Sequence, residues 1–593
     1  MRSAALSIIL LALTLTGVRA ERLGLVVVPT VAGNPLSLDS LRYSNEHSQS
    51  YSISRLSFFL SDFSLITAKG QTTPIPDSVG WFDAGKRRWS VRLDSAPKGS
   101  YAGLQFKLGV PDQLNNADPW VYSSDHPLNP NLNGLYWNWQ GGYIFSAIEG
   151  HFSDSRTRQV NGFSYHFARS QNLTPITLRS DFEISGPTEV QLTLDLAKVL
   201  HGKEPIDFER IGNSTHSAPG DEIASALKAN FPEAFQFIAS QSLLPQALQP
   251  SAKLPLYQPE NAQPARFTMS RRFPIPALPK DNPLIQSRVE LGKTLFNDPQ
   301  LSRNSSISCA SCHQAEAGFS DSRRFSLGVE NRQGNRQSMP LFNLAWKSKF
   351  FWDGRANSLR EQALMPVQDH LEMDLELPEL VARLRKDTEM NQAFAAAFNS
   401  PDVTAERIAL ALENFLLTLT SYNSKFDQVI QGKATFTPEE QKGFELFVTE
   451  NEPRSGRYGA DCFHCHGGPL FTDHGFRNNG LDEVVTDPGV AKVSGNRSDA
   501  GKFSTPSLRN IALTAPYMHD GRFDTLAEVV RHYSSGVKRS PTLDANLAKH
   551  PEGGLALSEA DQAALVAFLK TLTDPKLVSH QPEKHQVVTL QNQ

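Results

Sequence analysis

Two short stretches decide how the second half of this chain is interpreted: CASCH at residues 309–313 and CFHCH at residues 462–466. In each, two cysteines stand three positions apart and a histidine follows directly. With this spacing two thiols can attach a haem and the imidazole can coordinate its iron. The rival interpretation, half of a zinc site, leaves both adjacent histidines unexplained. The two motifs contain all four cysteines of the chain. The sequence therefore predicts two covalent c-type haems, attached by Cys309, Cys312, Cys462 and Cys465, with His313 and His466 as iron ligands.

The first twenty residues have the composition of a signal peptide. Arg2 precedes an apolar run from Ala4 to Val18, and Ala20 ends a plausible cleavage site. We therefore expect a mature chain that begins at Glu21 and is exported to the periplasm, with an uncleaved anchor as the alternative. The run is short for a membrane span, and no later stretch is long and uncharged enough to form one.

Composition narrows the classes of function. The chain carries a formal net charge of -4, with acidic and basic side chains interspersed, so nothing indicates a nucleic-acid partner. No cysteine remains for a disulfide once the two motifs are counted. Packed cores and bound cofactors must therefore stabilise the fold.

Hydrophobic patterning divides the chain. Alternate residues from Leu104 to Val110 and from Val190 to Leu196 are apolar, which is the period of half-buried strands. A helix is expected from Asp221 to about Phe237, and the pattern becomes helical again from about Leu284. We therefore expect a signal peptide at 1–20, a β-rich, β-sandwich-like domain at 21–242, a Pro-, Gln- and Ala-rich linker at 243–279, two mostly helical haem lobes at 280–425 and 426–580, and a tail at 581–593.

Three longer motifs accompany the haem motifs between about Leu291 and Leu572: LGKTLFNDPQLS, FWDGRANSLREQALMPVQDHLEM and FSTPSLRNIALTAPYMHDGRF. In them the chain resembles the bacterial di-haem cytochrome c peroxidases, and within that family the MauG-like branch. The resemblance implies two cytochrome c-like lobes that face each other, with a calcium ion near their interface. It also implies that hydrogen peroxide reacts at the N-terminal haem while the C-terminal haem relays electrons.

The same resemblance implies roles for single residues. His313 would be the proximal ligand of the reactive haem and His466 that of the relay haem. Trp352 matches the tryptophan that lies between the two haems, and Gln362 and Glu372 match the pair in the distal pocket. The calcium ligands would be the carbonyl groups of Thr514 and Pro516, with Gln337 in place of the usual asparagine.

Glu372 suits its implied role on chemical grounds. Splitting peroxide on iron needs a group that moves a proton from the near oxygen to the far one, and burial raises the pKa of a carboxyl toward the working range. The alternative is a surface glutamate in a polar turn. Trp352 is core packing by default, but between two haems it would also relay electrons.

Two departures favour the MauG-like branch. Conventional members carry a histidine that blocks the reactive haem until the enzyme is reduced, and residues 314–351 contain none. The relay haem usually takes a methionine, which raises its potential. Tyr533 aligns with that position, whereas Met518 is out of register. A capped helix from Thr525 to Ser535 would turn Tyr533 inward, with a core tyrosine as the alternative. A phenolate favours ferric and higher-valent iron, so such a haem would help to store oxidising equivalents.

Several motifs of the first half lie between Glu21 and about Phe237: SISRLSFFLSDFSLI, GSYAGLQFKLGV, HPLNPNLNGLYWNWQGGYIFSAIEG, FSYHFA and HSAPGDEIASALKANFPEAF. In them the chain resembles the MbnP family of exported, copper-associated proteins. In that family a MauG-type partner enzyme, MbnH, oxidises a tryptophan of the MbnP protein to kynurenine. The resemblance therefore implies that an enzyme and its protein substrate share one chain.

The first half contains five of the seven tryptophans, and two of them, Trp137 and Trp139, lie in its YWNWQ motif. These two are the candidates for the oxidised residue. Imidazoles are common copper ligands, so His126 and His166 are candidate ligands, although a lone histidine is more often structural.

The leading hypothesis is a periplasmic, peroxide-dependent di-haem enzyme that forms a high-valent state and oxidises a tryptophan of its own N-terminal domain, in connection with copper. One alternative is a conventional cytochrome c peroxidase that takes electrons from a small c-type cytochrome or cupredoxin. The other is a copper-binding or electron-transfer protein without peroxide chemistry.

Overall fold

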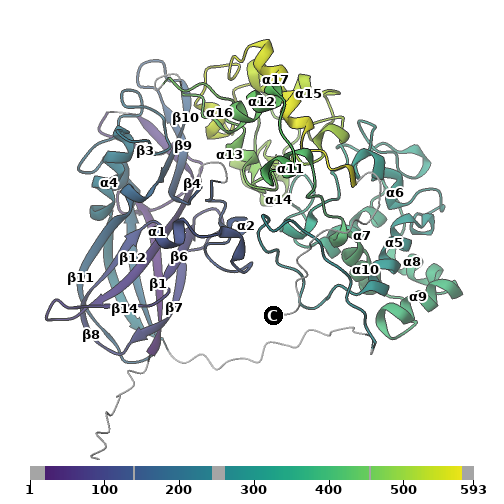
Figure 1. The fold of residues 1–593 in the computed structure, drawn as a ribbon, viewed down its shortest axis with the longest axis horizontal. Helices are drawn as coiled ribbons and strands as arrows, with labels where there is room; N and C mark the ends of the chain where they lie inside the picture. Colours follow the sequence, from purple (N-terminus) through teal and green to yellow (C-terminus); the bar gives the residue numbers. More distant parts are fainter. Residues whose placement is uncertain are drawn as a thin grey trace, which may run out of the picture.

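The computed structural model describes residues 20–47, 49–137, 141–243, 259, 261–452 and 456–576. The expected signal peptide up to residue 19, Trp139, residues 244–258 and 260 of the expected linker, and the tail lie outside the described residues. Figure 1 shows a β-rich half on the left and a helical half on the right. None of the described helices is long and apolar enough to cross a membrane.

The β-rich half is built from two sheets. One has the strand order β14-β12-β1-β2, with β7 on β1, and the other has the order β11-β8-β4-β9-β10-β13, with β3, β5 and β6 on β4. The strands are β1 (Ala20–Val31), β2 (Asn34–Pro35), β3 (Tyr43–Ser44), β4 (Ser50–Ile66), β5 (Thr72–Pro74), β6 (Val79–Asp83), β7 (Ser90–Pro97), β8 (Gly99–Leu108), β9 (Ile144–Ser153), β10 (Val160–Ala168), β11 (Thr174–Ile184), β12 (Thr188–Asp195), β13 (Ser214–Thr215) and β14 (Phe235–Ser242).

One hydrophobic core joins the two sheets. Leu104 and Phe106 of β8 and Leu192 of β12 are fully buried in the same cluster, as their alternation with other residues predicts. Short helices cover the ends of the sheets: α1 (Asp112–Asn115), α2 (Pro130–Asn133), α3 (Leu196–His201) and α4 (Glu222–Ala234). The β-sandwich-like architecture is thus confirmed.

The end of the first half differs from the expectation in two places. The helix expected to reach about Phe237 ends at Ala234, because Phe235 starts a strand that pairs with Leu194 of β12. Part of the stretch expected to be a linker is packed, since Phe267 and Phe273 are buried in the core of the first haem lobe. Sequence composition favoured a linker because prolines surround these two aromatic residues.

The helical half has two lobes with their own cores. The first lobe contains α5 (Gln286–Asn297), α6 (Cys309–Cys312), α7 (Leu359–Gln368), α8 (Leu377–Leu384), α9 (Thr388–Phe398) and α10 (Ala405–Thr418). The second contains α11 (Lys425–Ile430), α12 (Pro438–Val448), α13 (Phe463–His466), α14 (Ala491–Ser494), α15 (Leu526–Arg531), α16 (Ala545–Ala548) and α17 (Glu559–Lys570), together with the short strands β15 (Phe476–Arg477) and β16 (Phe503–Ser504).

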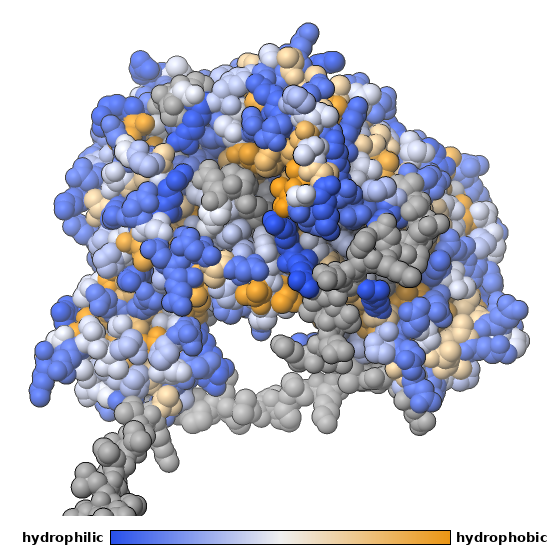
Figure 2. Space-filling model, in the orientation of Figure 1, coloured by the Kyte–Doolittle hydropathy of each residue, from blue (hydrophilic) through white to orange (hydrophobic). Residues whose placement is uncertain are grey.

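The β-rich half packs directly on the second haem lobe, where α16 lies beside β9 and β10 (Figure 1). The backbones approach so closely at Gly162 of β10 that a Cβ there would lie 2.0 Å from the carbonyl oxygen of Ala545. Asn546 also donates a hydrogen bond of 3.2 Å to Glu149 of β9. The surface in Figure 2 mixes hydrophilic and hydrophobic residues over both halves.

Candidate functional site

The first haem motif begins on α6, beside a large cavity. Its volume is about 1070 Å³, and Cys309, Cys312 and His313 line it. The Nδ1 of His313 lies 2.9 Å from the carbonyl oxygen of Phe319, which can only accept a hydrogen bond. Nδ1 therefore carries the proton, and the lone pair of Nε2 is left to coordinate a metal. Since ligand pockets commonly measure 300–1000 Å³, these residues fit a covalent haem.

Glu372, Gln362 and Trp352 line the same cavity. Burial, with a smaller contribution from the nearby charge of Asp369, raises the pKa of Glu372 to about 7. The backbone of Glu372 is fixed because its carbonyl oxygen accepts a hydrogen bond of 2.8 Å from Val329. His313 is the one histidine among the described residues that line the cavity.

Trp352 is buried at the contact between the two lobes. Its Nε1 donates a hydrogen bond of 2.8 Å to the carbonyl oxygen of Gln337 in the first lobe. Its own carbonyl oxygen accepts one of 2.8 Å from Ser504 in the second lobe. The first lobe therefore holds the indole and the second lobe holds the backbone of Trp352, as expected of a residue between two haem sites.

The second haem motif repeats the geometry of the first. The Nδ1 of His466 lies 3.2 Å from the carbonyl oxygen of Phe471, so this Nε2 is also left to coordinate a metal. Burial raises the pKa of the Tyr533 phenol to about 12, and the nearby charges of Cys465 and Cys462 add to the effect. The second motif thus also fits a covalent haem.

Tyr533 follows α15, whose N-terminus has the expected capping box between Thr525 and Glu528. The helix then widens into a π-helix from His532 to Gly536. The side-chain amide of Asn479 lies 3.4 Å from the hydroxyl of Tyr533 and 3.4 Å from the sulfur of Met518. Met518, which sequence alignment placed out of register, therefore reaches the same neighbourhood as Tyr533.

The expected calcium ligands lie at the contact between the lobes. Gln337 and Thr514 are buried there, and the side-chain nitrogen of Gln337 donates to Ser320 at 2.8 Å. Among the described residues, no hydrogen bond ends on the carbonyl oxygens of Thr514 and Pro516. Unengaged carbonyl oxygens in buried residues are ligands that calcium prefers, so this arrangement fits the ion.

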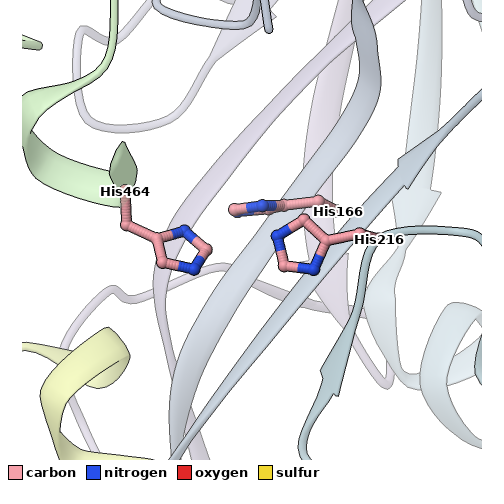
Figure 3. Close-up of side chains that lie close together, drawn as sticks. All are labelled: His166, His216 and His464. Carbon is pink, nitrogen blue, oxygen red and sulfur yellow. The ribbon is translucent and has the colours of Figure 1, made fainter. Parts of the chain in front are cut away.

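A cluster of three histidines joins the two halves of the chain. His166 comes from β10, His216 from the segment after β13, and His464 from α13 of the second haem motif (Figure 3). One ring nitrogen from each lies within 4.8 Å of the others. All three side chains are buried, with exposed fractions of 3%, 3% and 8%. This is the distance and burial expected of ligands to one metal ion.

The imidazoles of this cluster are suited to bind a cation. Burial lowers the pKa of His166 to about 4 and the pKa of His216 well below its usual value, so both rings are neutral at pH 7. Neutral imidazole is the form that coordinates metals. The carboxylate of Glu450 accepts a hydrogen bond of 2.9 Å from Nε2 of His464.

Trp137 lies next to the histidine cluster. Its ring centroid is 5.5 Å from that of His216 and 6.4 Å from that of His166. A small cavity of about 80 Å³ is lined by Trp137, His166, and Phe463 and His464 of the second haem motif. Trp137 therefore lies at the junction of the two halves, close to a haem motif.

The structure separates two expected copper ligands. His166 belongs to the cluster, whereas His126 stacks on Tyr122 with ring centroids 4.4 Å apart and belongs to neither group of potential metal ligands found among the described residues. The cluster instead contains His216 and His464, which sequence reasoning missed. The signals were present, because His216 opens the HSAPGDE motif and His464 stands inside CFHCH.

Comparison with known proteins agrees with these sites. Over 310 residues the chain is 35% identical to the methylamine utilization protein MauG of Methylophilus methylotrophus. The matched region covers 89% of that protein and 52% of this chain. The chain belongs to the di-haem cytochrome c peroxidase family. Residues 286–435 match the model of that family. Cytochrome c551 peroxidase of Nitrosomonas europaea is 32% identical over 312 residues, which are 85% of that protein and 51% of this chain.

The first half of this di-haem peroxidase is related to a different family. Residues 20–217 match the model of the MbnP family, so the predicted fusion of the two families is confirmed. A crystal structure of a MauG-like protein associated with microbial copper homeostasis is 34% identical to the chain, with a TM-score of 0.47, and the match covers 52% of this chain and 96% of that one.

Family membership fixes the general activity. The di-haem peroxidase half is an oxidoreductase that carries two c-type haems and uses hydrogen peroxide as its substrate. The two haem motifs are the residues of this chain that fit the two haems, and the cavity lies beside the first of them.

Proposed function

We propose that this chain is a periplasmic, MauG-type peroxidase that uses hydrogen peroxide to oxidise Trp137 of its own MbnP domain to kynurenine, in connection with copper binding. The observation that carries the proposal is the position of Trp137. It is 4% exposed, packs on His216, and shares a cavity with Phe463 and His464 of the second haem motif. The side chain to be oxidised and the oxidising half are therefore in contact within one molecule.

Glu372 handles the protons of peroxide cleavage. His313 would hold the haem, which would supply the redox chemistry of peroxide cleavage. The carboxylate of Glu372 would take a proton from one peroxide oxygen and return it to the other, which leaves as water. Its pKa of about 7 allows both transfers near neutral pH, and Gln362 lines the same pocket and would orient the peroxide.

Tyr533 is proposed to hold the iron of the relay haem together with His466. Burial raises the pKa of its phenol to about 12, so the hydroxyl keeps its proton unless a cation lies beside it. A ferric iron would supply that cation, and the resulting phenolate favours the more oxidised states of iron. Trp352, held by both lobes, would pass electrons between the two haem sites.

The oxidation of Trp137 balances with hydrogen peroxide as the only oxidant. Two peroxide molecules and one tryptophan give N-formylkynurenine and two water molecules. One water then hydrolyses the formyl group, which leaves as formate, and kynurenine remains. The cavity of about 80 Å³ beside Trp137 has room for such a water, since a site needs roughly 10–15 Å³ per water.

Copper would bind next to the oxidised residue. Of the two ligands expected from sequence, His166 supports this proposal and His126 does not, since His216 is the imidazole that adjoins His166 and Trp137. A calcium ion held by Gln337, Thr514 and Pro516 would brace the contact between the lobes. Neither ion is needed for the electron balance given above.

Peptide mass spectrometry of the holo-protein, before and after two equivalents of hydrogen peroxide, tests the proposed function. We expect kynurenine in place of Trp137 in the wild type and no such product in Glu372→Gln, whose MbnP domain is unaltered. If the MbnP peptides stay unmodified and peroxide is consumed only when a reduced cytochrome c is added, the chain is a conventional peroxidase. If peroxide is consumed under neither condition, the haems serve electron transfer or copper binding alone.

A further inference from the structure

We propose that His464, which lies on α13 within the second haem motif, is a metal ligand together with His166 and His216. The metal site is then assembled from both halves of the chain and is coupled to the second haem. This inference rests on the copper-linked function proposed above and adds the enzyme half to the ligand set. A free-standing MbnP domain would lack this third imidazole.

The unpaired nitrogens of the cluster point to a missing ligand. Among the described residues, Nδ1 of His166, Nδ1 of His464 and both ring nitrogens of His216 are buried without a hydrogen-bond partner. His216 Nε2 lies 3.2 Å from a carboxylate oxygen of Glu450, but without hydrogen-bond geometry. A buried nitrogen without a partner costs about 1–3 kcal/mol. Each ring places one nitrogen within 4.8 Å of a nitrogen of the other two, and each ring has at least one nitrogen without a partner among the described residues. A shared cation would explain both observations.

The opposite nitrogens are held as they are in metal sites. Nε2 of His166 lies 3.0 Å from Oε1 of Glu149, and Nε2 of His464 lies 2.9 Å from Oε2 of Glu450. A carboxylate on one ring nitrogen favours the tautomer that leaves the lone pair of the other nitrogen free for a metal. The ammonium of Lys549, paired with Glu450, also lies 3.1 Å from Nε2 of His464. Glu149 and Glu450 belong to different halves, so each half orients its own ligand.

The charge around the cluster suits a monovalent cation. Glu450 and Asp461 are buried acids, and the buried side chain of Lys549 forms ion pairs with both. The formal charges of these three groups sum to minus one, while Glu149 is neutralised by Arg55 at 2.8 Å. Imidazole ligands suit copper, and Cu⁺ would bring the buried group of charges to zero.

The position of His464 couples this site to the second haem. His464 stands between the two cysteines that attach that haem, and Cys465 is its direct neighbour in the chain. A cation bound to His464 stabilises the haem in its reduced state, because reduction adds a negative charge nearby. Binding at the cluster must therefore raise the reduction potential of the second haem and leave that of the first less affected.

Two measurements on the full-length holo-protein, made before any peroxide is added, test this inference. Competition with a chromophoric chelator gives the Cu⁺ affinity, and a redox titration with and without Ag⁺, a redox-inert mimic of Cu⁺, gives the haem potentials. We expect one tight site, and a rise in one haem potential when Ag⁺ binds. His464→Gln should lower the affinity by at least about tenfold, since loss of even an outer partner costs about 10–100-fold, and should abolish the potential shift.

His126→Gln is the matched control, because it removes a histidine of the same domain that lies outside the cluster. This variant should keep both the affinity and the potential shift of the wild type. If His464→Gln loses haem, the wild-type titration decides the question alone. Equal affinities in wild type and His464→Gln, or haem potentials that Ag⁺ leaves unchanged, would overturn the inference. A failure of Trp137 oxidation would overturn the proposed function but would not change these readings.

Discussion

Glu372 shows how the surroundings of one residue set its chemistry. An exposed glutamate is ionised above about pH 4.3, whereas burial beside the first haem motif raises the pKa of Glu372 to about 7. Below that pH the carboxyl is protonated and cannot accept a proton from peroxide. We expect the rate of the peroxide reaction to rise with pH, with a midpoint near 7, in stopped-flow measurements. Glu372→Gln should lower the rate by about 100- to 10,000-fold and remove that midpoint.

Glu376→Gln is a matched control for this prediction. Glu376 follows four residues later, does not line the cavity, and has an exposed side chain. The variant should keep the rate and the pH midpoint. A wild-type midpoint near pH 4 would contradict the proposed role, since the titrating group would then be an ordinary exposed carboxyl.

The candidate site residues that lie within a contiguous sequence motif could be predicted from the sequence. Those that are distant in the sequence and come together only in the folded chain could not. The haem-attaching cysteines and Glu372 lie in ordered motifs, so spacing and resemblance were enough to find them. His464 and His216 are separated by 248 positions, and no local pattern relates them. They meet because the segment after β13 and α13 lie on opposite sides of the contact between the two halves.

The close contact between β10 and α16 is what holds the MbnP domain against the second haem lobe. Gly162→Val would place a side chain where Ala545 already lies, with the new Cβ 2.0 Å from its carbonyl oxygen. Overpacking of this kind costs about 1–3 kcal/mol and pushes the elements apart. We expect a lower yield of kynurenine at Trp137 in peptide mass spectrometry, while peroxide is still consumed with an added electron donor.

Gly186→Val is the control for this variant. Gly186 lies in the turn between β11 and β12, and a Cβ there would meet nothing within 4 Å. It should leave both the kynurenine yield and the peroxide consumption unchanged. A full kynurenine yield in Gly162→Val would show that the observed contact does not position Trp137.

Helices and strands could be predicted where one local sequence signal, such as an alternating apolar pattern or a capping box, specifies them. The strands β8 and β12 alternate cleanly, and α15 begins with a capping box, so their sequences specify them locally. The strand β14 was missed because most of its residues are exposed, and its pairing with β12 replaces any alternating pattern. Its formation depends on a partner strand about forty positions earlier in the chain.

The whole molecule joins a di-haem peroxidase to an MbnP domain, which we propose as its protein target. Such a fusion makes the encounter of the two halves intramolecular, so the effective concentration of the target no longer depends on the amount of protein. Trp137 is 4% exposed and faces the second haem motif of its own chain. Another molecule cannot reach it unless the two halves separate. The arrangement therefore predicts oxidation within one chain.

A mixing experiment tests this prediction on full-length holo-proteins. Glu372→Gln keeps Trp137 but lacks the proton-transfer group, whereas Trp137→Phe keeps the peroxidase and lacks the target. If oxidation occurs within a chain, an equimolar mixture treated with peroxide should form no kynurenine, and the wild-type rate constant should not change over a tenfold range of concentration. Kynurenine at Trp137 of the Glu372→Gln chain in the mixture would show transfer between molecules. The buried contact between the two halves would then have to open during the reaction. Opening of that contact, rather than chemistry in the haem pocket, would be the step that limits the rate of oxidation.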